Sequence, residues 1–493
     1  MLQRLKQPET LMVILCIGLY LMVLYREPVI GVADNGDFAR VMPAAGVQYL
    51  DSSESYEDRY FRYSHQEYAF GAIRPGGYAS SQLPFLFLAG LIGRLVGGSF
   101  DIRILSALYM AVFAVALSLL VKGTKTRFPA LSLLLVPVLA LVFLDVGYLA
   151  YFNSFYGEPA ALLFLLLTTA LGFAVTGREL PSRRLLALFL LSAAALAGTK
   201  LQHAPIGIAC ALLSLRFARL RADRAWKRLA RGGAAALVAL SLLVVGIAPG
   251  GLKQINLYQT VFYGVLKDSP HPERDLHSLG LPSRLAILAG TNYFQGNTVI
   301  PPDDPLLHRE LYDKLSHADI VRYYLLHPFR FVQKLENAAR NAMMIRPYYL
   351  GNYEKAAGKP PGSLSFTFSS WSEFKHRTLP NTLGFTTAVF AFYLAGVLAR
   401  RRQTRDRRGR IHLEVLLLLP AIAAFSLVTP ILGDGEADLG KHLFLFNACF
   451  DAMLVVMALW IAWVLRQAAE RVWGRRRMRA RALVPAEREE GQG

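Results

Sequence analysis

Long apolar runs constrain this chain more than any other feature of its sequence. Leu131–Phe143 and Val415–Phe425 contain no charged residue and do not alternate apolar with polar positions, as a half-exposed helix or strand would. Hydrophobic residues make up 54% of the 493 positions, and several runs are long enough to cross a bilayer as helices. The sequence therefore predicts an all-α polytopic membrane protein.

The positions of the basic residues predict the topology. They lie in clusters between the apolar runs, at Lys122–Arg127, Arg178–Arg184, Arg216–Arg231 and Arg400–Arg410, as is typical of cytoplasmic loops. The net charge of +19 therefore indicates membrane topology and no nucleic-acid partner. Leu83–Val96 is short and contains Pro84 and Arg94, and if it crossed the membrane the later basic clusters would face outside. We therefore expect an interfacial helix there.

About ten transmembrane helices follow from this reading, with both termini in the cytoplasm. The predicted spans are residues 10–26, 102–121, 129–149, 158–175, 184–199, 204–219, 233–250, 383–399, 412–431 and 449–465. The chain then divides into a transmembrane module at 1–250, which includes a first loop at 27–100, and an outside loop subdomain at 251–382. C-terminal helices at 383–465 and a basic cytoplasmic tail at 466–493 complete it. Within the late loop, a helical stretch over Ser316–Ile345 should break at His327-Pro328.

Ionisable residues collect at the predicted outer boundary of the membrane, where each is costly unless it has a role. They are Asp34, Asp37, Glu158, Lys200, His203, Asp434, Glu436, Asp438, Lys441 and His442. Lys200 is either a phosphate anchor or a lysine that reaches the lipid headgroups. The Asp434–His442 stretch either recognises a polar acceptor or phosphate or is a hydrated loop. Because all these residues face one side, we expect a common site.

The first loop begins with Asp34-Asn35-Gly36-Asp37-Phe38-Ala39, and in this it resembles the GT-C glycosyltransferases that use polyprenyl-phosphate-linked sugars. That superfamily includes protein mannosyltransferases, the aminoarabinose transferase of lipid A and bacterial surface-glycan hexose transferases. Asn35 stands where glutamate is common, and Asp37 supplies the second acid. Leu83–Val96 followed by Asp101-Ile102-Arg103 resembles the surface helix and arginine of the same superfamily.

The resemblance implies an inverting glycosyltransferase at the outer face of a bacterial cytoplasmic (inner) membrane. Its substrates would be a polyprenyl-phosphate-linked sugar donor and a glycan, lipid or protein acceptor. Asp34 would be the catalytic base with Asp37 as the second acid, and Lys200, Arg103 and Arg74 would hold the donor phosphate. The expected substrate-binding residues are Glu158, His203, Tyr156, Asp434, Glu436, Asp438, Lys441 and His442. No obligatory metal is expected, although Asp34, Asp37 and Glu158 offer oxygen ligands for a divalent cation.

Two other functions fit the sequence. An O-antigen polymerase or ligase with an undecaprenyl-diphosphate donor would use Arg330, Arg340, Arg346 and His327 of the late loop. A lipid-linked-sugar flippase or other secondary transporter should show related halves and ionisable residues near the bilayer midplane. Nucleotide-driven and soluble-cofactor chemistry have no support, because the chain lacks G-x-S-x-G, Walker, H-E-x-x-H and dinucleotide-binding motifs.

Overall fold

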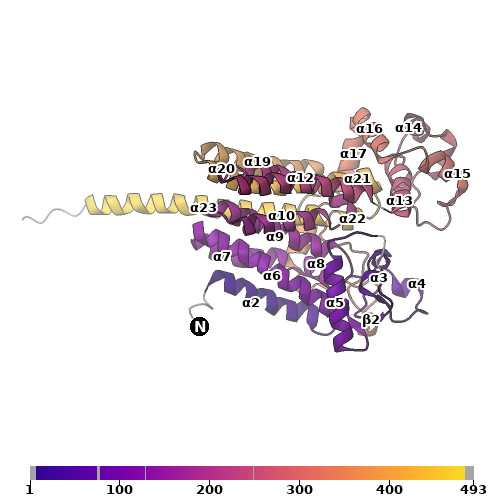
Figure 1. Ribbon diagram of the computed structural model, residues 1–493, viewed down its shortest axis with the longest axis horizontal. Coiled ribbons are helices and arrows are strands. Elements are labelled where there is room, and N and C mark those ends of the chain that lie inside the picture. The colour runs from indigo at the N-terminus through magenta and orange to yellow at the C-terminus, as the bar shows by residue number, and fades with distance from the viewer. Residues whose placement is uncertain (1–6, 75–77, 128, 248, 483–493) are drawn as a thin grey trace, which may run out of the picture.

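The computed structural model of the chain describes residues 7–74, 78–127, 129–247 and 249–482. Long helices lie side by side in a bundle, and the connecting segments of the first and late loops gather at one end of it (Figure 1). We call this the loop-bearing end. Helix α2 (Pro8–Tyr20) begins and α23 (Phe444–Ala482) ends at the opposite end.

The prediction of a multi-pass membrane protein is confirmed, but ten spans are not. Within the part of the chain that the structure describes, seven helices are long and apolar enough to cross a membrane, or eight if a pair bent by 56° counts as one span. That pair is α7 (Pro129–Phe143) with α8 (Val146–Leu149) and η3 (Ala150–Asn153). Helices α10 (Arg183–Ala197) and α11 (Ile206–Phe217), at two of the predicted spans, have only 15 and 12 residues.

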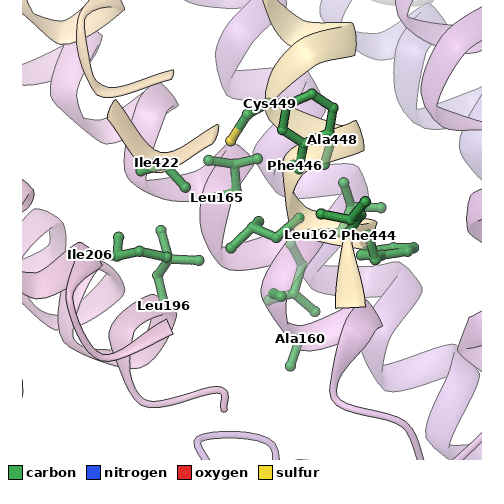
Figure 2. Packing of buried hydrophobic residues seen from close by; sticks show 14 of the residues in the cluster. Ala160, Leu162, Leu165, Leu196, Ile206, Ile422, Phe444, Phe446, Ala448 and Cys449 are labelled. Atoms are coloured by element: carbon green, nitrogen blue, oxygen red, sulfur yellow. The ribbon is translucent and has the colours of Figure 1, made fainter. Parts of the chain in front are cut away.

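The membrane helices pack around α9 (Glu158–Gly177), most of which is buried. Figure 2 shows Leu162 and Leu165 of α9 beside Phe444 and Phe446 at the start of α23. The other long helices are α6 (Ile102–Arg127), α12 (Arg224–Gly246), α19 (Leu383–Gln403) and α21 (Leu418–Asp434), which continues the ten-residue α20 (Arg407–Leu416) as one candidate span. The start of α9 is therefore fixed from several sides, and this is where the site begins.

The first loop is folded, and it contains a small sheet that the sequence pattern did not indicate. Strands β1 (Val47–Tyr49), β2 (Glu67–Phe70) and β3 (Phe100–Asp101) pair antiparallel in that order. Tyr49 lies opposite Tyr68 in the register. Around the sheet are η2 (Asp37–Arg40), α3 (Met42–Ala45) and α4 (Tyr56–Arg59). The chain is thus mostly helical, as predicted, and this loop adds a few short strands.

Helix α5 spans Leu83–Val96, the range predicted for the interfacial helix. Figure 1 shows it lying across the direction of the membrane helices at the loop-bearing end. Its last two residues, Leu95 and Val96, are 80% and 76% exposed. This combination fits a helix at a membrane surface.

The late loop contains short helices joined by irregular segments. They are α13 (Gly250–Thr260), η5 (Val261–Val265), α14 (Pro272–Ser278), η6 (Ser283–Leu288), α15 (Pro305–Leu307), η7 (His308–Tyr312), α16 (His317–Leu326), α17 (Pro328–Ala339), η8 (Lys355–Ala357) and α18 (Ser370–Thr378). The helix predicted over Ser316–Ile345 does break at His327, because proline favours the first turn of the next helix.

The late loop also holds the first loop in place. The amides of Gly31 and Ala33 donate to the carbonyls of Asn352 and Gly351, at 3.0 and 2.9 Å. Gly351 is required by this close approach, since a Cβ there would lie 2.0 Å from the carbonyl oxygen of Arg62. The residues just before Asp34 are therefore positioned by a segment more than 300 places away in the sequence.

A buried ion pair fastens α18 to α23. Lys375 Nζ lies 2.5 Å from Asp451 Oδ1, and both side chains are fully buried. Tyr148 and Trp371 donate to the other carboxylate oxygen, so the acid is well satisfied. At the opposite end of the bundle, Glu414 pairs with Arg216 and Arg401 of two predicted cytoplasmic clusters. The arginines of the predicted tail at 475–481 and residues 483–493 lie outside the described side chains.

Candidate active site

Asp34 is buried inside the first loop, where it organises the turn that follows it. Its Oδ1 accepts the backbone amides of Gly36 (2.8 Å) and Phe38 (3.1 Å), and its Oδ2 accepts the hydroxyl of Tyr49 at 2.6 Å. Gly36 has φ +100°, which favours glycine and lets the chain enter η2 directly. Burial raises the pKa of Asp34, and these three donors oppose the rise. The carboxylate is therefore largely occupied by its own loop.

Asp37, one turn later, faces a lysine from the far end of the sequence. Lys441 Nζ lies 2.5 Å from Asp37 Oδ2 and 2.7 Å from Asp438 Oδ2, while Arg40 lies 2.9 Å from Asp37 Oδ1. Burial alone would raise the pKa of Asp37, but Lys441 and Arg40 hold it well below its usual range. Burial would likewise lower the pKa of Lys441, and Asp37 with Asp438 raises it instead. The pair is therefore ionised at neutral pH.

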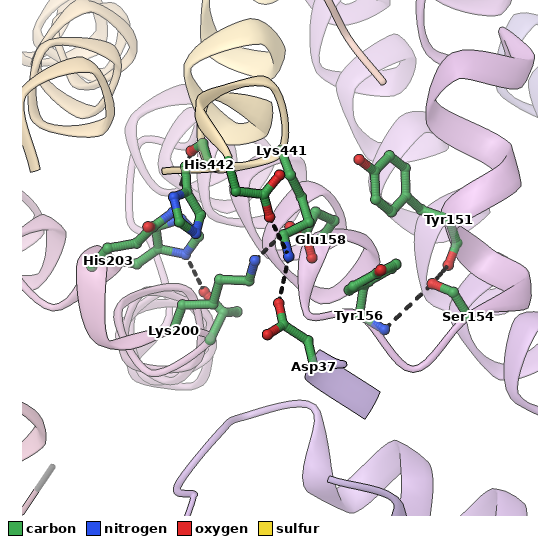
Figure 3. Close-up of polar contacts among 12 residues, drawn as sticks. Asp37, Tyr151, Ser154, Tyr156, Glu158, Lys200, His203, Lys441 and His442 are labelled. Carbon is green, nitrogen blue, oxygen red and sulfur yellow. Dashed lines mark hydrogen bonds and ion pairs between the residues drawn. The ribbon is translucent and has the colours of Figure 1, made fainter. Parts of the chain in front are cut away.

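A second ion pair, Lys200–Glu158, lies beside the first (Figure 3). Glu158 opens α9 with Pro159 behind it, and Lys200 lies between α10 and the short helix η4 (Leu201–His203). Gly157 makes room for the lysine, because a Cβ there would lie 3.2 Å from Lys200 Cε. Lys200 also contributes to lowering the pKa of Asp37. Two lysines, Arg40 and three carboxylates therefore meet at the loop-bearing end.

Two histidines, His203 and His442, lie next to Lys200 at one side of this cluster. His203 Nδ1 hydrogen-bonds to Thr199 Oγ1 at 2.6 Å, and Gln202 donates to the carbonyl of His442 at 3.2 Å. Burial, together with Lys441 and Lys200, lowers the pKa of His442 to about 3. His442 Nδ1 lies 3.6 Å from the Asp434 carboxylate. At neutral pH His442 is therefore an uncharged hydrogen-bonding group.

Tyr156 lies between the first loop and Lys441. Its hydroxyl donates to the Ala33 carbonyl at 2.8 Å and accepts the amide of Asn35 at 2.9 Å. The Lys441 ammonium lies over the Tyr156 ring, 5.0 Å from its centre, which favours the charged form of the lysine. Asn35 also donates to Asp438 at 2.9 Å. The turn that follows Asp34 is thus joined directly to the Asp434–His442 segment.

Three buried oxygens around the cluster have no hydrogen-bond partner among the described residues. They are Glu158 Oε2, Asp438 Oδ1 and the Tyr151 hydroxyl. Figure 3 shows Tyr151 next to Tyr156 and Glu158. Buried polar atoms are normally paired, so unpaired ones point to a missing ligand or water. Two carboxylate oxygens can only accept, so a hydroxyl-bearing ligand would satisfy them.

The structure brings most of the predicted site residues together, but three lie elsewhere. Arg103 pairs with Asp101 at 2.5 Å and stacks on Tyr25 at the start of α6. Arg74 is exposed on the first loop. Glu436 points into the late loop, where it binds Lys334, Lys267 and Asn337 at 2.7–3.0 Å. For Arg103 and Glu436, a closer partner of opposite charge takes the side chain away from the cluster.

Some residues of the cluster were not predicted. Arg40 carries a local signal, because it follows Asp37 by three positions and can pair with it on one helical turn. Tyr49, Tyr151 and Asn35 carry no such signal, since their partners are distant in sequence or are backbone groups. Two of the three arginines predicted for a polymerase or ligase bind groups of the late loop itself, and Arg340 is exposed. Arg346 donates to Asn352 and Ser365, and Arg330 donates to the Val265 carbonyl.

Among residues 7–74, 78–127, 129–247 and 249–482, no group of three or more His, Cys, Asp or Glu side chains is placed to hold a metal ion. Asp34, Asp37 and Glu158, the ligands that the sequence offered for a divalent cation, instead face Tyr49, Lys441 and Lys200 respectively.

Comparison with known proteins gives one match. The family model described as "YfdI N-terminal transmembrane domain" matches residues 1–481. No curated protein matches the chain, and no solved structure does.

Proposed function

This chain belongs to the YfdI N-terminal transmembrane domain family, and from that premise we propose that it is an integral-membrane glycosyltransferase of cell-surface glycan assembly. It would move a sugar from a polyprenyl-phosphate donor to a glycan, lipid or protein acceptor at the loop-bearing end of the bundle. The observation that carries this proposal is the paired arrangement Asp37–Lys441–Asp438 beside Lys200–Glu158. The GT-C resemblance of the first loop supports it.

The two lysines suit the phosphate of a lipid-linked donor. They lie at the ends of apolar helices, where a headgroup is within reach while its isoprenoid chain stays in the bilayer. A lysine ammonium binds phosphate as a compact charge with three donors. In the free protein both lysines are neutralised by carboxylates. An incoming phosphate would therefore compete with Asp37 for Lys441 and with Glu158 for Lys200.

This competition would prepare Asp37 to act as the general base. When the phosphate draws Lys441 away, the pKa of Asp37 rises because its stabilising cation is shared. Asp37 then takes the proton of the acceptor hydroxyl as that oxygen attacks the anomeric carbon. The bond from that carbon to the phosphate oxygen breaks, and polyprenyl phosphate leaves with inversion. A base so positioned contributes about 10²–10⁴-fold to the rate.

Asp34 has a different role in this scheme, although the sequence resemblance assigns the base to it. Its oxygens already accept two amides and the Tyr49 hydroxyl, so we assign it to shaping the turn that presents Asp37. The unpaired oxygens of Glu158 and Asp438 would accept hydroxyls of the bound sugar. Neutral His442 and His203 would line the same substrate.

The test uses purified protein in lipid vesicles with a panel of undecaprenyl-phosphate sugars. Turnover is measured as the amount of undecaprenyl phosphate that is released. Asp37→Asn should lower turnover by about 10²-fold or more. Asp34→Asn is the matched comparison, because its amide oxygen can still accept the two backbone amides, and it should keep much of the activity. If Asp34→Asn lowers turnover more than Asp37→Asn does, Asp34 is the general base. If both variants keep full turnover, the proposed mechanism is wrong.

A further inference from the structure

The corner where α16 meets α17 carries a group of exposed apolar side chains. Leu325 is 76% exposed, Leu326 is 67% exposed and Phe329 is 91% exposed. Val321 and Val332 extend the same surface at 39% and 52%. We call these five residues the apolar tip. Contiguous exposed apolar surface of this kind marks a contact with another apolar phase or a partner.

The tip is exposed although the opposite faces of both helices are packed. Ile320, Tyr323 and Tyr324 of α16 are buried, as are Lys334 and Ala338 of α17. The corner itself is held by His327, whose ring stacks on Tyr323, with ring centres 4.4 Å apart. The apolar tip therefore cannot turn inward without dismantling an ordered core, and its apolar surface needs a cover from outside the chain.

The position of α16 and α17 indicates that a lipid bilayer can cover the apolar tip. The end of α17 is fixed to the start of α19, where Leu383 donates its amide to Glu336 at 3.0 Å. Figure 1 shows α16 and α17 beside the loop-bearing end of α21, reaching sideways from it. Helix α5, with its exposed Leu95 and Val96, lies on the other side of the bundle in the same view. A bilayer surrounding the membrane helices would have its surface close to both.

The charges near the apolar tip fit the surface of a bilayer. Arg322, next to Val321 on α16, is exposed and basic, and Asp319 on the preceding turn is half-buried. Phe and Leu beside exposed arginines are typical of segments that lie in the headgroup region, where the apolar groups enter and the cations meet phosphates. A water-facing surface would gain nothing from Phe329 at this exposure.

We propose that the apolar tip of α16–α17 inserts into the headgroup and upper acyl region of the leaflet at the loop-bearing end, with Arg322 at the level of the lipid phosphates. This is an interaction surface for lipid, and it does not depend on the glycosyltransferase proposal. Through Lys334, which pairs with Glu436 at 2.7 Å, the same unit is joined to the segment that carries Asp438 and Lys441. Membrane contact and the ionised cluster would thus share one anchored element.

The test is the depth of spin labels on full-length protein in phosphatidylcholine–phosphatidylglycerol vesicles. The three native cysteines are buried, so single exposed cysteines can be labelled selectively. Labels at Phe329→Cys and, separately, Leu325→Cys should collide with oxygen more often, and with a water-soluble nickel chelate several-fold less often, than a label at Glu273→Cys on exposed α14. A label at Leu242→Cys gives the reference for a position in lipid, because Leu242 lies on membrane helix α12 and is 67% exposed.

Two results would overturn the proposal. If both tip labels match the Glu273→Cys label, the tip lies in water. If they are shielded from oxygen and nickel alike, a protein surface covers the tip and lipid does not. Using two separate tip positions guards against one labelled variant that fails to fold.

Discussion

At the level of single residues, Asp34 and Asp37 differ in what their carboxylates already hold. Asp34 is occupied by fixed donors of its own loop, and Asp37 is held by cations that a phosphate could recruit. The distinction depends on side-chain direction, which three residues of sequence spacing do not reveal. Comparing the turnover of Asp34→Asn with that of Asp37→Asn is therefore the sharpest test of the proposed chemistry.

His442 provides a pH-dependent prediction. Its pKa is lowered from 6.5 to about 3 in the folded protein, so the unfolded chain binds the proton first as pH falls. Below about pH 6.5 the wild type should lose up to about 1.4 kcal/mol of stability per pH unit from this group. His442→Gln should flatten that part of the stability profile, measured as thermal unfolding in detergent between pH 5 and 7. An unchanged slope in the variant would contradict the buried neutral state.

The sequence carries the positions of the polar residues but not their partners. A charge next to an apolar run is a local signal, and it identified Asp37, Glu158, Lys200, Asp438 and Lys441. Pairing is not local, since Lys441 and Asp37 are separated by 404 residues. Arg103 and Glu436 carry the same local signal, yet each pairs with a closer residue of opposite charge. For Arg103 that residue is Asp101, two positions earlier in the sequence, and for Glu436 it is Lys334, which only the folded chain brings near.

At the level of elements, the break at His327 and the bounds of α5 were predictable because proline and apolar length are local properties. The three-stranded sheet was not, because its strands have only two to four residues and depend on pairing across the first loop. The prediction of ten spans is not confirmed, for a related reason. Apolar runs such as α10 and α11 satisfy composition, while their helices are shorter than a bilayer requires.

Glu436 lies at a contact between two elements. It holds α17 against the segment after α21, and Lys334, whose side chain is 1% exposed, depends on it. Glu436→Gln should leave that ammonium buried without a full counter-charge, at a cost of about 3 kcal/mol or more in the free energy of unfolding. Lys334→Met combined with Glu436→Gln should recover much of the loss, because neither charge then remains. A double variant as unstable as the sum of the single variants would contradict this coupling.

At the level of the whole molecule, the two ends of the bundle differ in charge chemistry. The loop-bearing end gathers carboxylates with Lys200 and Lys441, and the opposite end gathers arginines such as Arg216 and Arg401. Arginine-rich loops between apolar helices favour the cytoplasm. The candidate site would then face away from the cytoplasm, in agreement with the lipid-linked donor that we propose.

This orientation can be measured by labelling introduced cysteines, because the three cysteines of the chain itself are buried and should not react with the label. Glu273→Cys places a thiol on exposed α14 of the late loop, and Arg402→Cys places one on the exposed end of α19. In spheroplasts, a membrane-impermeant maleimide should modify the cysteine at 273 at once and the cysteine at 402 only after the membrane is opened. The reverse pattern would place the Asp37–Lys441 cluster on the cytoplasmic side. A soluble activated sugar would then become the better donor, and the lipid-phosphate role of the two lysines would have to be abandoned.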